Sequence, residues 1–424
     1  MGIDHGTPGS QTLIGGMQDN GCMFTTSDDP LEPWIELHEG DGGYSYISDG
    51  GKYFYTNQGA VFRVWRHSFP NGEHEWTMVT PTATQGTGIW LSPFIMDPHD
   101  YKIMYLPWRR ELWRNFDVTE IPFSFPAAPT DLNWEKLENV TDTYISAVGM
   151  SAAQPRRLYY GGLDGKLFRL DNPYTGQPVP EMMSDGSDWM YGYIHCIAVD
   201  PRDADKVIVV LPNYGIISIY ASNDGGDTWK AVSGNLEENY DGTGCGPSVR
   251  WISILYVEDK PVYFAGTSVG LFSTTKLDSM NTIWIHEGAS TIGNVVVDMI
   301  DVRQSDGYVA VGTHGNGVYT TYVTELPTGL KEITTHPENF KLYPAYPNPF
   351  NSSTTIRFFL PKTGLVRMTV YNILGEKVEV LIDKNCQQGE NSVQWTAKGA
   401  SSGTYFIRLN YENFNETQKV LLLK

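Results

Sequence analysis

The chain has 424 residues, enough for one large and one smaller domain, and its net charge at pH 7 is −19. So large an acidic excess would be repelled by nucleic-acid phosphates and by anionic membrane surfaces, so neither is expected as a partner. The 43 glycines, the 13% aromatic content and turn-forming Gly, Asn, Asp and Pro throughout the chain favour an all-β fold.

The N-terminus and the cysteines exclude several further classes. Residues 1–5 lack the basic and apolar regions of a signal peptide, and no run is long and apolar enough to cross a bilayer. The four cysteines lie far apart and form no CxxC pair. We therefore expect no metal, no cofactor and no transmembrane segment, and the sequence defines no disulfide.

A unit of about 50 residues, the size of a four-stranded propeller blade, repeats along residues 1–324. Its clearest copy predicts strands over Ile194–Val199, Val207–Val210 and Ile216–Tyr220, and a fourth strand from Trp229. Gly-rich corners and strands that open on tryptophan recur in the other copies, so residues 1–324 are expected to repeat one small antiparallel sheet.

The corner before Trp229 carries the most specific motif of this repeat. Ser222 and Asp224 can hydrogen-bond to their own turn backbone, glycines such as Gly226 permit positive φ, and Trp229 anchors the next strand. The pattern S-x-D-x-G-x-x-W is the Asp box, and the segment resembles the repeat signature of Asp-box β-propellers such as sialidases and sortilin-type receptors. The resemblance implies a propeller, and it says little about chemistry because the box lies on the outer rim of such folds.

Seven cycles can be counted, which predicts a propeller of roughly seven blades. The first cycle begins at its second strand and the last stops after its third, near residues 319–321. Either residues 1–10 or 322–335 fill a gap in the ring, or further blades precede Met1 in the natural protein. We favour further blades, because they would also explain the missing signal peptide.

Two carboxylates are the candidates for acid–base chemistry. Asp19 and Asp41 lie in Gly-rich corners where backbone can approach a ligand, and glycosidases use a pair of carboxylates across the scissile bond. Structural Asx turns are the alternative role for both. The sequence Gly266–Gly270 matches G-x-S-x-G, but strands are expected on both sides, which does not fit a nucleophile elbow.

Aromatic residues outside the regular strand positions are the candidates for ligand binding. Sugars stack their apolar faces on exposed rings while neighbouring polar groups bind the hydroxyls. Packing between blades is the alternative role of such rings. The candidates are Trp90, Trp108, Arg109, Trp189, Tyr191 and Trp251.

The composition changes after the repeats. Residues 325–340 are rich in Pro, Thr and Gly without periodicity and are expected to be a linker. Residues 341–424 contain ten Lys and Arg against six Asp and Glu, a net charge of +4, which leaves −23 for the rest of the chain. Short alternating strands separated by glycines predict a small immunoglobulin-like β-sandwich there.

Four motifs in order give this segment a second resemblance. The stretches 343–351 (YPAYPNPFN), 370–378 (VYNILGEKV), 403–406 (GTYF) and 419–424 resemble the type A C-terminal sorting domain of type IX secretion cargo. The resemblance implies export through the periplasm and the type IX machinery to the outer surface or the exterior of a Gram-negative bacterium. The motif residues are Pro347, Asn348, Pro349, Phe350, Gly375, Gly403, Tyr405, Lys419 and Lys424.

These observations favour a binding protein over an enzyme. The leading expectation is a secreted or surface-attached propeller that binds an extracellular glycan or another polymer through its loop face. A glycoside hydrolase of the Asp-box propeller type, using Asp19 and Asp41, is one alternative. A structural or adhesive surface component that binds protein partners is another.

Overall fold

The computed structural model describes residues 1–48, 50–59, 63–84, 86, 88–138, 140–326, 340–411 and 414–423. The chain forms two compact units, Met1–Gly329 and Leu330–Lys424. Both units consist of small antiparallel sheets, which confirms the predicted all-β class. The described helices are single 3-10 turns: η1 (Pro70–Gly72), η2 (Thr82–Thr84), η3 (Val118–Glu120), η4 (Ser187–Trp189) and η5 (Gly234–Leu236).

The described part of the first unit contains seven sheets, in each of which every strand pairs with the next one along the chain. Six sheets have four strands and the last has three. The first three are β1 (Gly2–Ile3), β2 (Leu13–Met17), β3 (Gly21–Thr25), β4 (Ile35–His38); β5 (Gly42–Ser48), β6 (Tyr53–Gln58), β7 (Arg63–Ser68), β8 (Glu75–Met78); and β9 (Ile95–Asp97), β10 (Asp100–Trp108), β11 (Glu111–Asn115), β12 (Trp134–Leu137). The other four are β13 (Ile145–Met150), β14 (Arg157–Gly162), β15 (Leu167–Asp171), β16 (Glu181–Ser184); β17 (Cys196–Asp200), β18 (Asp203–Val210), β19 (Ile219–Ser222), β20 (Lys230–Ala231); β21 (Val249–Val257), β22 (Lys260–Thr267), β23 (Gly270–Thr274), β24 (Ile285–Glu287); and β25 (Val297–Arg303), β26 (Tyr308–Thr313), β27 (Val318–Tyr322).

The hydrophobic core of this unit lies between neighbouring sheets. Tyr105 and Leu112 of the third sheet pack with Leu158 and Tyr160 of the fourth. Comparable clusters join the first sheet to the second, the second to the third, the fourth to the fifth, the sixth to the seventh and the seventh to the first. A sheet covered on both faces needs apolar residues on both, which is why β18 contains the continuous run 207–210 (VIVV). The strands therefore gain most of their stability from the next sheet, not from their own hairpin.

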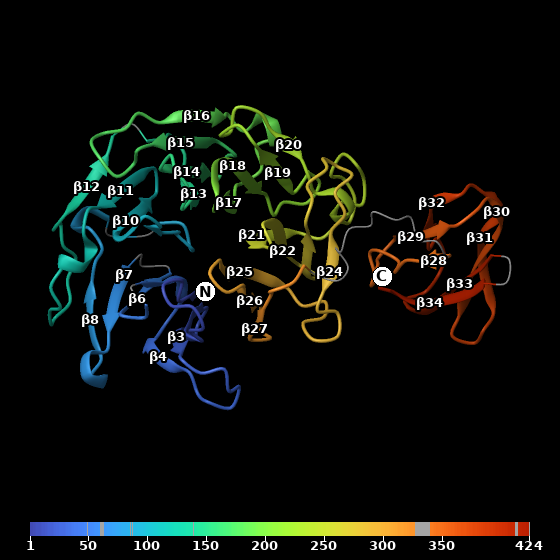
Figure 1. The fold of residues 1–424 in the computed structure, drawn as a ribbon, viewed down its shortest axis with the longest axis horizontal. Helices are drawn as coiled ribbons and strands as arrows, with labels where there is room; N and C mark the ends of the chain where they lie inside the picture. Colours follow the sequence, from blue (N-terminus) through green and yellow to red (C-terminus); the bar gives the residue numbers. More distant parts are fainter. Residues whose placement is uncertain are drawn as a thin grey trace. The chain divides into compact units, whose positions relative to one another are not determined.

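The seven sheets follow one another around a common centre (Figure 1). Their first strands are in contact in sequence: β9 with β13, β13 with β17, β17 with β21, β21 with β25, β25 with β1, and β1 with β5. Between the second and third sheets, the rings of Tyr46 and Tyr101 lie 6.0 Å apart. The first strands therefore surround the centre, and the later strands of each sheet lie outside them.

The N-terminal segment joins the first sheet to the last. The Ile3 amide donates to Asp301 Oδ2 at 3.0 Å, and His5 Nε2 lies 3.2 Å from the same carboxylate. The buried Arg303 donates to the carbonyls of Asp4 (2.7 Å) and Ser10 (2.9 Å). Of the two segments considered for the gap in the ring, residues 1–10 supply β1, the first strand of the first sheet.

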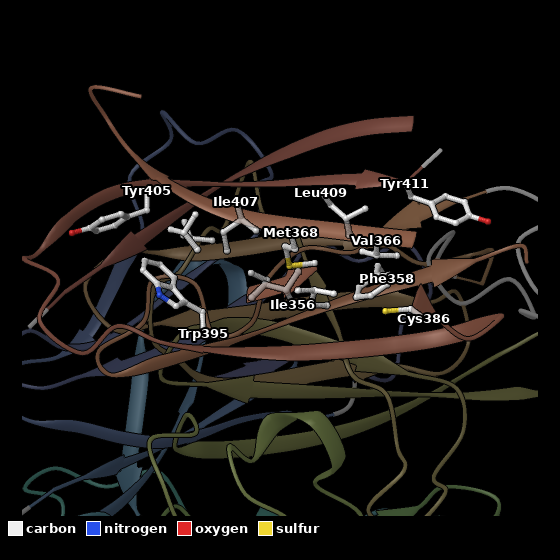
Figure 2. Packing of buried hydrophobic residues seen from close by; sticks show 14 of the residues in the cluster. Ile356, Phe358, Val366, Met368, Cys386, Trp395, Tyr405, Ile407, Leu409 and Tyr411 are labelled. Carbon is white, nitrogen blue, oxygen red and sulfur yellow. The ribbon is translucent and has the colours of Figure 1, made fainter. Parts of the chain in front are cut away.

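The described part of the second unit is made of two sheets that enclose one core. The first contains β28 (Lys341–Leu342), β29 (Ser353–Leu360) and β32 (Gly389–Thr396), and the second contains β31 (Lys377–Cys386), β30 (Gly364–Asn372), β33 (Gly403–Tyr411) and β34 (Phe414–Leu422). Figure 2 shows Ile356 and Trp395 of the first sheet packed with Met368 and Ile407 of the second. Most of the predicted linker, residues 327–339, lies outside the described residues.

Three histidines are stacked where the first two sheets meet. His67 is 1% exposed, its Nδ1 lies 3.1 Å from His74 Nε2, and its Nε2 lies 3.0 Å from Thr56 Oγ1. The His38 ring is stacked on His67 with 6.1 Å between centroids. Burial lowers the pKa of all three, and that of His67 falls well below its usual value.

This cluster predicts acid-sensitive stability. Below about pH 6.5 the unfolded chain binds protons that the folded cluster rejects, so the free energy of unfolding falls as the pH is lowered, by at most about 1.4 kcal/mol per pH unit for each histidine. We expect His67→Gln to make this dependence shallower. Urea unfolding between about pH 7.5 and pH 5.5 measures the slope. His314→Gln, at a side chain that is 76% exposed, should leave it unchanged; equal slopes for wild type and His67→Gln would contradict the prediction.

Candidate functional site

The Ser222–Trp229 corner, the predicted Asp box, forms a closed set of hydrogen bonds between β19 and β20. Asp224 Oδ1 accepts from the Thr228 amide (2.9 Å) and from Ser222 Oγ (2.7 Å), and Ser222 Oγ accepts from the Gly226 amide (2.9 Å). The Thr228 hydroxyl donates to Oδ2, and these bonds to Thr228 and Ser222 lower the pKa of Asp224 to about 2. The carboxylate is occupied by its own turn, which gives it a structural role.

The same corner packs against the preceding sheet. Gly226 has a φ of +102°, and a Cβ there would lie 2.9 Å from Met183 Cγ of β16, so the position suits only glycine. The Trp229 ring meets Trp189 edge-on, with 5.3 Å between centroids. The box therefore links two consecutive sheets as well as closing a hairpin.

The two candidate acidic residues lie next to each other on neighbouring sheets. Asp41 Oδ1 accepts a hydrogen bond from the Asp19 amide at 2.9 Å, and Asp19 has a left-handed φ of 60°. This bond fixes the β2–β3 turn against the start of β5. It is a structural contact between distant residues and not one of the expected Asx turns, and a catalytic role for the pair remains a prediction.

The candidate aromatic residues separate into buried and exposed groups. Trp189 is fully buried, with its indole N–H bonded to the Gly165 carbonyl at 2.7 Å, and Trp108 is 4% exposed beneath the Arg109 guanidinium. Neither ring is open to a ligand, because each fills the core. Trp90 and Tyr191 are 50% and 62% exposed on loops.

The exposed candidates share one edge of the sheets. In an antiparallel meander, the segment that enters the first strand and the turn between the second and third strands lie at the same edge, which we call the loop face. Asp19, Asp41, Trp90 and Tyr191 all lie on such segments. A Cβ at Gly59 would lie within 3.4 Å of both Asp41 Cβ and the Trp90 carbonyl, which places those two residues close together.

Six residues converge at the centre of the loop face, where the first strands begin. The Tyr44 ring of β5 and the Trp251 ring of β21 lie 6.3 Å apart, although they belong to the second and sixth sheets. His195 lies 6.4 Å from Trp251 and is hydrogen-bonded through Nδ1 to the Tyr193 hydroxyl. We call this set the axial cluster: Tyr44, Tyr193, His195, Arg250, Trp251 and Asp298.

An ion pair completes the cluster. Arg250 Nη1 lies 2.7 Å from Asp298 Oδ1, and the side chains are 37% and 39% exposed. His314 Nδ1 lies 3.4 Å from the other oxygen of Asp298. The pair is open to solvent, so it contributes little to stability and keeps donors and acceptors within reach of a ligand.

The environment keeps His195 and Tyr193 of the cluster neutral. Burial, and then the nearby Arg250 charge, lower the pKa of His195 to about 4, while Asp298 opposes the shift. Burial raises the pKa of Tyr193 to about 12. An uncharged imidazole and an uncharged phenol can donate to and accept from hydroxyl groups at neutral pH, but they are a weak base and a weak acid.

Sequence reasoning identified only part of this cluster. Trp251 was expected as a ligand-binding residue, and Tyr193 lies two residues after the candidate Tyr191. Tyr44, His195 and Asp298 begin three different repeats and carry no local motif. All three lie near the start of the first strand of a repeat, and this shared position is the sequence signal that could have identified them.

Within the described residues no group of three or more His, Cys, Asp or Glu is arranged to hold a metal ion. The described helices are all too short to cross a membrane.

In the second unit, the proline-rich motif is bound to the last strand. Asn348 accepts from the Leu421 amide (2.8 Å) and donates to the Lys419 carbonyl (3.1 Å). The Phe350 backbone bonds on both sides, to the Leu421 carbonyl and the Leu423 amide, and its ring lies 5.2 Å from Trp395 in the core. The motif therefore closes the sandwich over β34.

The other motif residues are divided between turns, core and surface. Pro347 accepts a hydrogen bond from Thr354 through its carbonyl, Gly375 has a left-handed φ of 78° in the β30–β31 turn, and Gly403 begins β33. Tyr405 is 8% exposed. Pro349 lies within the bound motif, Lys419 is exposed on β34, and Lys424 lies outside the described residues.

Residues 344–423 match the model of the secretion system C-terminal sorting domain. This establishes the predicted address: the protein is exported by type IX secretion to the bacterial surface or exterior. No curated protein matches the sequence significantly. The chain is similar to PorZ from Porphyromonas gingivalis, described as an essential bacterial surface component of the type IX secretion system, with 11% identity and a TM-score of 0.37. The similarity covers all of this chain and 51% of that one, so the chain spans about half of its length.

The Asp-box geometry predicts a local stability effect. Asp224→Ala removes the acceptor for the Thr228 amide and for two hydroxyls, and we expect a loss of about 1–2 kcal/mol in the free energy of unfolding. Asp227→Ala is the matched control, since Asp227 is exposed in the same turn and its substitution should change stability by less than about 0.5 kcal/mol. Chemical denaturation of the two variants makes the comparison, and equal stabilities would show that the box bonds contribute nothing.

Proposed function

We propose that this exported protein is a seven-bladed Asp-box β-propeller that binds an extracellular glycan, or another extracellular polymer, through its axial cluster. The proposal has two parts, the architecture of the first unit and the chemistry of its loop face.

The architecture rests on the sheets and their contacts. Seven antiparallel meanders surround a common centre, their first strands touch in order, and residues 1–10 join the first sheet to the last. The hydrogen-bonded corner at Ser222–Trp229 lies between the outer strands of its sheet, as expected for an Asp box. These are the features of a propeller whose blades are the seven sheets.

The observation that carries the binding proposal is the convergence of aromatic rings and hydrogen-bonding groups from several sheets. Tyr44, Tyr193 and Trp251 are partly exposed rings beside the open Arg250–Asp298 pair. Sugars present apolar faces to such rings and hydroxyls to such polar groups. First strands from four different sheets position these groups, so the site is rigid before ligand binds.

The electrostatics favour binding over catalysis at this site. Glycoside hydrolysis needs two carboxyl groups that work as acid and base or nucleophile. The axial cluster has one, Asp298, which is paired with Arg250. A hydrolase is the second candidate function, and the observation that favours it is the proximity of Asp19 and Asp41.

Loss of the Trp251 ring should weaken glycan binding. We expect Trp251→Ala to reduce affinity by roughly 10- to 100-fold, because burying a large ring against a ligand contributes about 1.5–3 kcal/mol. Retention on a glycan array identifies a ligand, and calorimetry on that glycan measures the change. Trp76→Ala is the control, since Trp76 is 42% exposed on β8, a fourth strand at the outer side of its sheet.

A second variant removes one group without changing the packing. Tyr193→Phe keeps the ring and loses the hydroxyl that contacts His195, and should weaken binding while the protein remains folded. Equal glycan affinity in Trp251→Ala, Tyr193→Phe and Trp76→Ala would overturn the proposed site. Turnover of a polysaccharide that is abolished by Asp19→Ala or Asp41→Ala would establish the hydrolase instead.

A further inference from the structure

The β30–β31 turn of the second unit exposes two large apolar side chains on a rigid turn. Ile373 is 69% exposed and Leu374 is 76% exposed. Asn372 fixes the turn: its Oδ1 accepts from the amides of Leu374 and Glu376, both at 3.0 Å, and its Nδ2 donates to Glu376 Oε2 at 2.7 Å. The turn is ordered by polar bonds, so the fold does not need either apolar side chain.

The outer face of the adjoining sheet continues this exposed surface. Figure 2 shows Tyr405 and Ile407 pointing into the core, so the alternate residues Phe406 and Arg408 lie on the opposite face. Tyr371 is paired directly with Phe406, and Phe406 with Lys419, across three neighbouring strands. Directly paired residues of antiparallel strands share a face, so these three side chains form a row beside the turn.

The row is aromatic and basic. Phe406 is 36% exposed, and the Arg408 guanidinium lies 5.2 Å from the centre of the Tyr371 ring. Lys419 is exposed at the end of the row. We call the combined surface the docking patch: Tyr371, Ile373, Leu374, Phe406, Arg408 and Lys419.

Parts of three sorting motifs that are far apart in the sequence meet at this patch. The sorting-motif residues that the fold requires are occupied elsewhere: Phe350 and Tyr405 are in the core, and Asn348 binds the last strand. The patch contains side chains that the fold leaves exposed. Adjacent exposed apolar side chains rimmed by polar groups are typical of a surface for a protein partner.

We propose that the docking patch is the surface by which the type IX secretion machinery recognises this chain. The partner surface accepts Ile373 and Leu374 in an apolar groove, with acidic groups at its rim that face Arg408 and Lys419. The net charge of +4 on residues 341–424 fits such a partner. The proposal rests on the sorting domain and is independent of glycan binding by the first unit.

The test compares export of two variants from the producing bacterium, each made as the full protein from its own gene. Ile373→Ser combined with Leu374→Ser should lower the ratio of exterior to periplasmic protein roughly tenfold or more, because it removes the apolar contacts of docking. The purified double variant should unfold at the wild-type temperature, since both side chains are exposed in the folded unit.

The matched control is Leu365→Ser. Leu365 is 60% exposed on the same strand and face, about 20 Å from Tyr371, and its loss should leave export unchanged. Normal export of the double variant, or an equal loss in Leu365→Ser, would overturn the proposal. Two other results would also overturn the proposal. If the double variant converts a dimer to a monomer in light scattering, the patch binds a second copy of the chain. If the double variant makes the protein more expanded in small-angle scattering, the patch binds the first unit of the same chain.

Discussion

Burial of both faces of each small sheet is the constraint on which the first unit depends. A single meander of four short strands cannot form a core alone, so each sheet must lie between two others, and the row of sheets must close. The closure is made by residues 1–10, held by Asp301 and Arg303 of the last sheet. Arg303 is buried, and its hydrogen bonds to the Asp4 and Ser10 carbonyls give both carbonyls a partner inside the protein.

The same closure creates the candidate binding site. When the first strands surround a centre, the residues that begin them come together whatever their separation in the sequence, as Tyr44 and Trp251 do. Burial and the Arg250 charge keep His195 uncharged at this position. A frame of aromatic rings and polar groups suits recognition of hydroxyl-rich ligands, and the acid–base chemistry of a hydrolase would need a second carboxyl group besides Asp298.

The second unit shows how one set of motifs can serve both folding and recognition. The proline-rich motif closes the sandwich over β34, with Phe350 against Trp395, and so stabilises the domain. The motif side chains that are not used in this packing lie on the face of the β30–β33–β34 sheet that points away from the core. An export receptor that bound this face would bind only the folded C-terminal domain, because the patch exists only when the three strands are paired.

The sequence alone determined what depends on local chemistry. Strand alternation, glycine-rich corners and the S-x-D-x-G-x-x-W pattern predicted the repeating sheets, because turns and period-two patterns act over a few residues. The order of motifs in residues 341–424 likewise indicated the sorting domain. Only the tertiary structure decided that residues 1–10 complete the first sheet, that Trp189 is buried while Trp90 is exposed, and that the axial cluster exists. These depend on contacts between distant segments, whose geometry is set when the ring closes and not by any local pattern.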